Sequence, residues 1–501
     1  MPDGAKPAAA NRTATERAIE AGITPGTHKW FVLSVVSVGT FMATLDGSIV
    51  NISLPTIQSA FGVSLSAIEW VVVAYLLTVG TLLLPFGRAG ELLGYKRVYV
   101  TGFVFFTAAS VLCGLSLTIW MLVVFRIIQG IGASMLQAMG PAIVAATFGP
   151  RERGRALGLN SVSVSVGLSV GPTIGGILTE YGSWRWIFYI NLPVGIFAIL
   201  WAMRVLERER HGGQDQFDIR GATLQLAALL SLLLALIEGQ SWGWTSSLVV
   251  GLLAAFVVFG AAFIMTELRS PHPMLDLRLF KIRPFSAGNG ALMISFAALF
   301  TATFLMPFFL IQGEGFSTLR AGLLLTPIPL TTMIFAPLSG ALSDRIGQRI
   351  PATAGLAVMA LGLYLLTGIR IGMPTWDLVV RLMVIGVGQG LFTSPNSSAV
   401  LGSVPRARLG TASATLAQMR IDGQAVGIAA AGAIVAAQTA AYVAKLSGTL
   451  APELVQREAF VHAIHDAFFV AAIVCLFAIL ASMVRGPRLE EEIGPANTNH
   501  G

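Results

Sequence analysis

Two charged residues, Asp46 and Arg126, lie inside long apolar stretches of the sequence. An ionised side chain at the centre of a bilayer costs about 3 kcal/mol on insertion scales, so residues of this kind are usually kept for function. Asp46 precedes Pro55, near the end of its stretch, by nine residues, and Arg126 lies about eight residues after the start of its own stretch. At about 1.5 Å per helical residue, both side chains are expected roughly 12 to 14 Å below the same surface, where they could meet.

A carboxyl group beside an arginine in hydrocarbon is a candidate proton-binding site. Burial favours the neutral carboxyl, whereas a nearby guanidinium favours the carboxylate, and competition between the two makes the group responsive to protons. The sequence therefore predicts that Asp46 takes a proton from one side and releases it on the other, with Arg126 tuning it and Gln129 completing the hydrogen bonding. The alternative is a permanent structural salt bridge.

Asp422 and Arg420 form a second charged set inside an apolar stretch, at residues 410–437. Asp422 lies about 12 residues into this stretch and is expected near its middle. Because the two residues are two positions apart, they point to opposite sides of a helix, and each needs a partner elsewhere. The acid could bind a cationic substrate or a second proton, and the alternative is a polar contact between groups of helices.

Other candidates are less specific. Phe304 and Phe308 could give a soft apolar lining for lipophilic compounds, although lipid-facing residues have the same composition. Glu238 could belong to the same substrate site, but its neighbouring tryptophans favour a position at the membrane surface. His462 and His465 are three residues apart without further ligands nearby, so no metal site is expected.

The composition shows what must position these residues. The chain has 501 residues, of which 55% are hydrophobic and only 11% charged, and its mean hydropathy is +0.76. A soluble protein of this length would be about one quarter charged, so a multi-span membrane protein is expected. No cleavable signal is apparent, because the first 28 residues are polar and the first apolar stretch is long enough to span. Cys113 and Cys475 lie inside apolar stretches, so no disulfide framework is expected.

Fourteen stretches of about twenty residues have the length needed to cross hydrocarbon. Most of the 32 Lys and Arg residues fall in the two tails and in alternate loops, so this side is expected to be cytoplasmic, with both termini on it. The excess of Lys and Arg residues is therefore explained by membrane topology and not by nucleic-acid binding. The predicted spans are 29–53, 67–87, 98–117, 119–143, 156–178, 185–203, 220–239, 247–266, 286–310, 320–342, 351–370, 376–400, 410–437 and 464–484.

The two halves of the sequence repeat each other. The loop at 87–97 resembles the loop at 340–349, and Glu91 recurs as Asp344 at an offset of 253 residues. Arg126 recurs as Arg381 at an offset of 255. Agreeing offsets predict parallel copies of one six-span unit, with two spans inserted between them. Charges in the two loops could bridge the bundles when the inner side is closed, and pure topology signals are the alternative. The expected gating residues are Gly87, Glu91, Gly94, Lys96 and Arg97, and Gly340, Asp344, Arg345, Gly347 and Arg349.

This repeat divides the chain into five predicted parts. They are a cytoplasmic tail at 1–28, a six-helix bundle at 29–203, a two-helix insertion with flanking loops at 204–285, a second six-helix bundle at 286–484, and a cytoplasmic tail at 485–501.

Small residues cover one face of the span at 156–178. Gly167, Gly171 and Gly175 recur every four residues, so they line one side of a helix and allow another backbone to approach. Pro172 removes a backbone donor and should bend the helix, which is tolerated in lipid only where protein or water satisfies the freed carbonyl. With Gly176 these residues predict a hinge-like span, and simple small-residue packing is the alternative.

Together these motifs resemble the fourteen-span drug:proton antiporter branch of the major facilitator superfamily, from about residue 30 to residue 485. The span containing Pro172 looks like the antiporter signature of its exporters. There are departures, because Glu91 and Leu92 stand where the family usually has aspartate and arginine, and span 10 carries no acid before Asp344. The other matching strings begin at Leu45, Gly87, Arg126 and Trp184.

The expected protein is an all-α membrane protein with fourteen transmembrane helices, in two six-helix bundles plus two inserted helices. The resemblance implies a proton-coupled antiporter that exports amphipathic or lipophilic drugs, cations included, across the cytoplasmic (inner) membrane by alternating access. No nucleotide-binding loop, metal cluster or nucleophile arrangement is evident, so we expect no enzyme, cofactor, nucleotide or nucleic-acid partner. The expected partners are the substrate, protons and lipid, with the protein a monomer. Export of an endogenous lipid, peptide or metabolite is one alternative, and a non-transporting receptor or scaffold is another.

Overall fold

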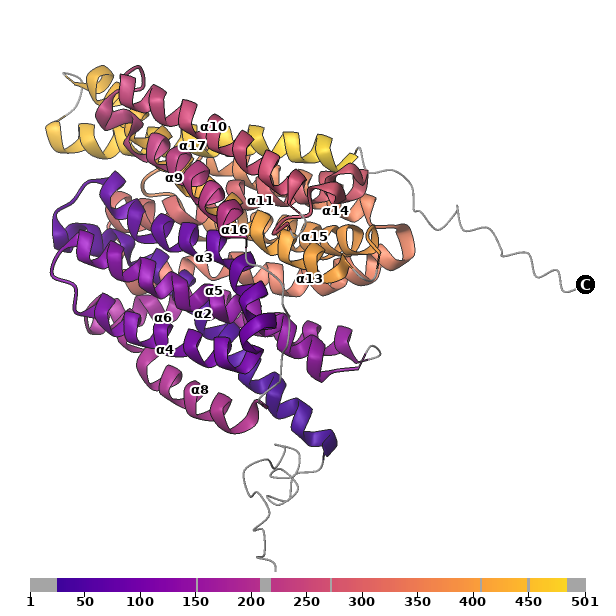
Figure 1. The fold of residues 1–501 in the computed structure, drawn as a ribbon. Coiled ribbons are helices and arrows are strands. Elements are labelled where there is room, and N and C mark those ends of the chain that lie inside the picture. The colour runs from indigo at the N-terminus through magenta and orange to yellow at the C-terminus, as the bar shows by residue number, and fades with distance from the viewer. Residues whose placement is uncertain are drawn as a thin grey trace, which may run out of the picture.

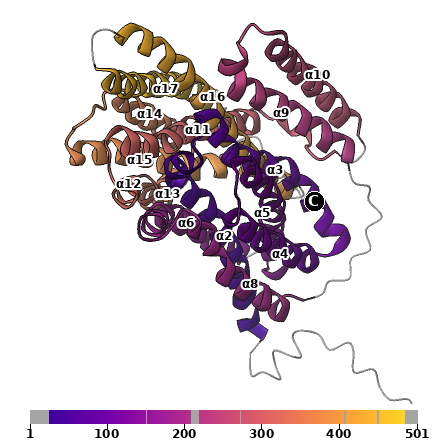
Figure 2. The ribbon, with the colours of Figure 1, turned by 90° about the vertical axis from the view of Figure 1, so that its left-hand side faces the viewer.

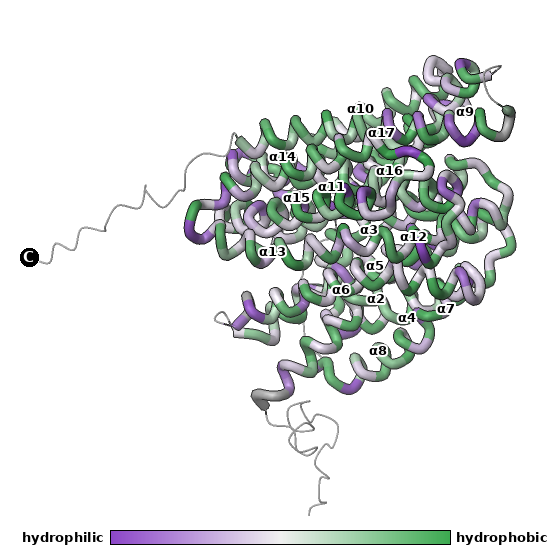
Figure 3. Tube along the Cα trace, turned by 180° about the vertical axis from the view of Figure 1, so that it is seen from behind, coloured by the Kyte–Doolittle hydropathy of each residue, from purple (hydrophilic) through white to green (hydrophobic). Residues whose placement is uncertain are grey.

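The computed structural model describes residues 25–149, 152–207, 218–270, 273–405, 408–447 and 451–483. The two predicted tails lie almost entirely outside these ranges. Within them, fourteen helices are long and apolar enough to cross a membrane, which confirms the predicted number. Figure 3 shows hydrophobic residues along most of the helices and hydrophilic residues gathered mainly near their ends.

The first bundle is built from the N-terminal half of the chain (Figure 1). Its fifth helix packs along its first, and its second packs along its fourth. Its helices are α2 (Pro25–Phe61), α3 (Leu65–Leu93), α4 (Tyr95–Gly114), α5 (Ile119–Thr147), α6 (Arg153–Tyr181), the short α7 (Trp186–Tyr189) and α8 (Asn191–Val205).

The second bundle repeats this arrangement in the C-terminal half, where α11 packs along α16 as α2 packs along α6. Span 10 is divided into two helices just before Pro327, a residue that lacks the backbone donor a continuous helix needs. The short 3₁₀ helix η1 (Leu277–Lys281) precedes this bundle. Its elements are α11 (Arg283–Phe308), the π-helical η2 (Phe309–Gly313), α12 (Thr318–Leu325), α13 (Pro327–Ile346), α14 (Arg349–Leu366), α15 (Thr375–Gly402), α16 (Leu409–Leu446) and α17 (Pro452–Met483).

Two inserted helices, α9 (Ile219–Trp242) and α10 (Ser247–Arg269), pack mainly on each other. Figure 2 shows them as a separate pair at the edge of the molecule. α9 also contacts α3 of the first bundle and α16 of the second, whereas α10 lies on the outside. The insertion therefore touches both bundles through α9.

Two helices extend well beyond the membrane spans predicted for them. The stretch at 410–437 continues as helix to Leu446, and the helix predicted from residue 464 begins at Pro452. Hydropathy marks only the part of a helix that can lie in hydrocarbon, and polar residues can continue the same helix beyond it.

The helix turns mark two ends of the molecule. Gly94 and Gly347 both have positive φ angles, of 93° and 84°, which glycine adopts readily, and they lie at the repeat offset of 253 residues. We call the end with these two turns the basic end. The end with the turns at Gly62 and Gly315 is called the far end.

The two bundles are joined at the far end. The side-chain amide of Gln312 donates to Gln58 at 2.9 Å, and the backbone amide of Thr318 donates to Glu180 at 2.9 Å. Among the described residues, no hydrogen bond or ion pair links the bundles at the basic end. Figure 1 shows the ribbons of the bundles diverging toward the right of the view, the side of the basic end.

Candidate functional site

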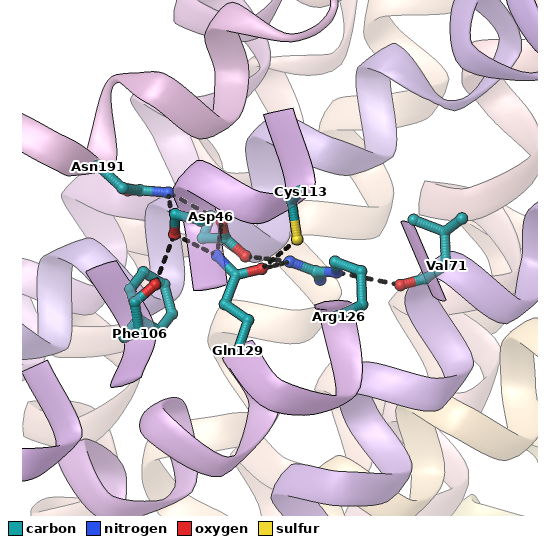
Figure 4. A network of polar contacts seen from close by, with 8 residues as sticks. Asp46, Val71, Phe106, Cys113, Arg126, Gln129 and Asn191 are labelled. Carbon is teal, nitrogen blue, oxygen red and sulfur yellow. Dashed lines mark hydrogen bonds and ion pairs between the residues drawn. The ribbon is translucent and has the colours of Figure 1, made fainter. Parts of the chain in front are cut away.

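Asp46 of α2 lies at the centre of a buried polar network within the first bundle (Figure 4). Its side chain is 0% exposed, and Arg126 of α5 donates through Nη1 to Oδ2 at 2.5 Å. Gln129 donates to Oδ1 at 2.8 Å, and Asn191 of α8 donates to the same oxygen at 3.0 Å. One cation and two amides thus surround a carboxylate that has no access to solvent.

The guanidinium of Arg126 also contacts α3. Its Nε donates to the carbonyl of Val71 at 3.1 Å, and its Cζ lies 4.0 Å from the centre of the Tyr75 ring. Its Nη2 is buried without a hydrogen-bond partner among the described residues, although the aromatic face offers some compensation. A buried donor left unbonded costs about 1–3 kcal/mol, so the network is not a fully satisfied salt bridge.

Ser110 and Asn191 are members of this network that the sequence reasoning did not single out. Gln129 donates to the hydroxyl of Ser110 at 2.7 Å, and Ser110 in turn donates to the carbonyl of Phe106 at 2.8 Å. This arrangement fixes the orientation of the Gln129 amide. Asn191 lies within the string that begins at Trp184, so a polar residue inside an apolar span was the available signal.

Asp422 lies where α16 of the second bundle packs against α3 of the first. It is 8% exposed, and Gln418 donates to its Oδ1 at 2.8 Å. A Cβ placed on Gly80 of α3 would be 3.1 Å from the same oxygen. None of the described basic residues forms an ion pair with Asp422, so the carboxyl at this interface has only an amide as its partner.

Arg420 is partly buried and makes no hydrogen bond or ion pair within the described part of the chain. It does not pair with Asp422, as its position on the helix predicts. The glycines on its side of α16, Gly423 and Gly427, lie against the backbone of α11 at Met293 and Ala297. Asp422 therefore faces the first bundle, while Arg420 belongs to the side of α16 that faces α11.

The glycine face of α6 allows the close helix contact that the sequence predicts. A Cβ on Gly167 would lie 3.2 Å from backbone atoms of α2, and one on Gly175 would lie 2.6 Å from the side chain of Ile52 on the same helix. Gly171 meets Ser48, and the Ser48 hydroxyl donates to the carbonyl of Leu168 at 3.1 Å.

This last bond explains how α6 accommodates its proline. Leu168 lies four residues before Pro172, so its carbonyl is the one that loses a helical donor. Neighbouring protein satisfies it, as a helix in lipid requires.

The same helix also meets the second bundle. A Cβ on Gly176 would be 2.8 Å from the Cα of Leu319 and from the carbonyl of Thr318. Gly322 lies directly against the carbonyl of Pro172. These backbone contacts hold α6 and α12 together near the far end without intervening side chains.

The expected aromatic lining is not found at an accessible surface. Phe304 and Phe308 are both 0% exposed, and their ring centres lie 5.3 Å apart. In this arrangement of the bundles neither ring is accessible from solvent, and the role of these two residues in a substrate site stays a prediction. Glu238 is partly buried at the end of α9, where Trp70 Nε1 donates to it at 3.4 Å and Ser241 donates to it at 2.7 Å.

Within the described part of the chain, the two loop regions at the basic end form no hydrogen bond or ion pair between the bundles. Glu91 forms an ion pair with Arg88 in the last turns of α3, and Lys96 donates to the carbonyls of Met203 and Leu206. The remaining charged residues expected in gating are exposed and make no ion pair with another described residue: Arg97, Asp344, Arg345 and Arg349.

Comparison with known proteins gives consistent results. The family model described as Major Facilitator Superfamily matches residues 36–269, 217–428 and 290–500. The riboflavin transporter RibZ of Clostridioides difficile (strain 630) is 35% identical over 457 residues, covering 91% of this chain and 97% of that protein. The multidrug resistance protein Stp of Mycobacterium tuberculosis (strain ATCC 25618 / H37Rv) is 33% identical over 435 residues, covering 87% and 81%.

A similar solved structure is that of a bacterial homolog of the human lysosomal transporter Spinster, in an inward-facing and unoccupied conformation. The TM-score is 0.65 with 16% sequence identity, and the match covers 94% of this chain and 99% of that one. This likeness establishes the fold alone.

Proposed function

The chain belongs to the Major Facilitator Superfamily and is a transporter rather than an enzyme, and from this premise we propose that it exports amphipathic or lipophilic drugs in exchange for protons. The observation that carries the proposal is the Asp46 carboxyl, which is fully buried and bonded to one arginine and two amides. Burial disfavours an ionised carboxyl at Asp46, whereas the guanidinium of Arg126 favours one. The site is therefore suited to change its protonation state.

A proton bound at Oδ2 of Asp46 removes the counter-charge of Arg126. The guanidinium then keeps its contacts with Val71 and Tyr75, which both belong to α3. Because α3 packs against α16 of the second bundle, a rearrangement at the proton site reaches the interface between the bundles. Proton binding and substrate binding would then favour opposite arrangements of the two bundles, which is alternating access.

The topology completes this proposal. The basic end carries the arginine-rich turns and is therefore cytoplasmic, with both termini on that side of the cell membrane. The far end is then outside, and its direct contacts describe a transporter closed to the outside. The two bundles proposed to move are residues 29–203 and residues 286–484, and the insertion between them is 204–285. The proposed transporter works as a monomer.

The substrate site is proposed to include α16. Asp422 presents an acid to the bundle interface, which suits a cationic substrate or a second proton. Arg420 offers a cation without a described partner on another side of the same helix. This arginine favours a second candidate function, the export of an endogenous metabolite that carries an anionic group.

Proton-coupled export is tested in proteoliposomes that hold an imposed pH gradient and a pH-sensitive dye. We expect candidate amphipathic compounds to collapse the gradient only in vesicles that contain the protein, because each exchange moves protons down it. Compounds that move at the same rate with and without a gradient would contradict proton coupling. Anionic and cationic members of one dye series distinguish the two substrate classes.

Replacing Asp422 with Asn is expected to weaken the binding of cationic compounds and to leave neutral ones unchanged. A hydrogen bond to a charged group contributes about 1.5–3 kcal/mol, which corresponds to about 10- to 150-fold in affinity. The measurement is a binding titration with a matched cationic and neutral pair. Asp466→Asn is the control, because this acid is bonded to Tyr442 in the α16–α17 hairpin. Equal affinity for the cation in both variants would favour a purely structural contact between bundles.

A further inference from the structure

Glu69 is a buried acid near the far end that the proton site at Asp46 does not use. It is the fifth residue of α3, so it lies about 6 Å along the helix from its start at Leu65. The side chain is 1% exposed, and its Oε2 has no hydrogen-bond partner among the described residues. A buried carboxylate in this situation would be an uncompensated charge.

The carboxyl group lies directly between the two bundles. It abuts Gly432 of α16, where even a Cβ atom would overlap with it. Since α3 belongs to the first bundle and α16 to the second, Glu69 can be enclosed in this way only while the bundles are in contact here.

The charged groups around Glu69 do not compensate it. α9 brings the carboxyl of Glu238 close enough to repel a charge on Glu69. The guanidinium of Arg126 on α5 is bonded to Val71 and, on α2, to Asp46. α16 presents a glycine, and no described cation forms an ion pair with either glutamate.

We propose that Glu69 is a second proton-binding site, which holds a proton from the solution at the far end while the two bundles are closed there. When the bundles separate, water reaches the carboxyl and it ionises. Acidification at the far end therefore favours the closed arrangement, and Glu238 of the inserted pair strengthens this dependence by repelling the charge. The inference rests on the proposed alternating access but not on proton coupling at Asp46.

The test measures closure of the far end directly. Gln58 and Gln312 hydrogen-bond across the two bundles, so cysteines at these positions can be joined by a short bifunctional thiol reagent when the far end is closed. The native cysteines, Cys113 and Cys475, are buried and should not react. Cross-linking is measured in purified protein without substrate, from about pH 5 to pH 9, a range that spans the titration of a buried carboxyl.

With the native Glu69, cross-linking should fall as the pH rises. Glu69→Gln carries a permanently neutral side chain of the same shape, so its cross-linking should stay high throughout. Glu69→Asp should restore the pH dependence, which separates protonation from a merely structural role. Glu238→Gln should make the fall in cross-linking at high pH smaller, because without the neighbouring charge an ionised Glu69 destabilises the closed arrangement less.

Two results would overturn the proposal. One is a pH dependence in Glu69→Gln equal to that of the protein with native Glu69, and the other is pH-independent cross-linking when Glu69 is present. Neither result bears on transport coupled through Asp46, which is measured separately as gradient collapse in proteoliposomes. The two proposals can therefore fail independently.

Discussion

Replacing Asp46 with Asn is expected to abolish proton-driven transport while leaving the protein in the membrane. The amide keeps an oxygen that can accept from Gln129 and Asn191, but it can neither bind a transported proton nor neutralise Arg126. Removing one partner of a buried ion pair costs about 3–5 kcal/mol, so the free energy of unfolding should fall by no more than this. Gradient collapse in proteoliposomes should fall to the rate of empty vesicles, and thermal unfolding in detergent should show a folded variant.

The second half of the chain offers a matched control for this variant. Arg381, the repeat counterpart of Arg126, pairs with Asp377 of its own helix at 3.0 Å, and both side chains are partly exposed. An ion pair that is open to solvent contributes little to stability, so Asp377→Asn should change neither stability nor transport appreciably. Full proton-driven activity in Asp46→Asn would show that the pair of Asp46 and Arg126 is only a structural salt bridge.

The location of the Asp46 network could be predicted because depth along a helix depends only on sequence distance. Asp46 and Arg126 lie at similar depths in neighbouring spans, and Gln129 is one helical turn from Arg126. The repeat alone would have been misleading, because Arg381 recurs at the same offset but finds an acid on its own helix. The acid that pairs with a cation inside a bundle depends on which side chains the neighbouring helices place beside it. The sequence repeat between the two halves does not determine those side chains.

Residues with short polar side chains could not be assigned in the same way. Ser110 belongs to the network, whereas Ser161 only donates to the carbonyl four residues before it, and both are serines in apolar spans. Glu69 was missed for another reason. It stands beside Trp70 at the start of a span, which is typical of the membrane surface, and only the approach of α16 at Gly432 buries it.

The aromatic residues of α11 show the limit of composition. Phe304 and Phe308 have the residue type expected for a drug-binding lining, but they pack in the interior of the second bundle. Sequence gives a helix its apolar faces without saying which one meets protein, lipid or substrate. The glycines of α6 were more informative, since a missing side chain at every turn has a consequence only where another backbone comes close.

Placing valine at Gly176 or Gly322 is expected to prevent the far end from closing. At Gly176 the added Cβ would lie 2.8 Å from the Cα of Leu319, and at Gly322 it would meet the carbonyl of Pro172. Backbone atoms on both sides cannot rotate away, so the overlap must be relieved by separating α6 from α12. Because these helices belong to different bundles, the strain acts on the closed arrangement rather than on the folding of either bundle.

Overpacking of this kind costs about 1–3 kcal/mol, which corresponds to a loss of about 5- to 150-fold in the closed population. Transport should fall with it, because every cycle passes through the closed far end. The Gln58→Cys/Gln312→Cys pair reports the closed population by cross-linking. Gly260→Val is the control, since nothing lies within 4 Å of a Cβ there. Undiminished cross-linking in Gly322→Val would show that α6 and α12 can close by another route, and the contact at Pro172 would then not be the gate.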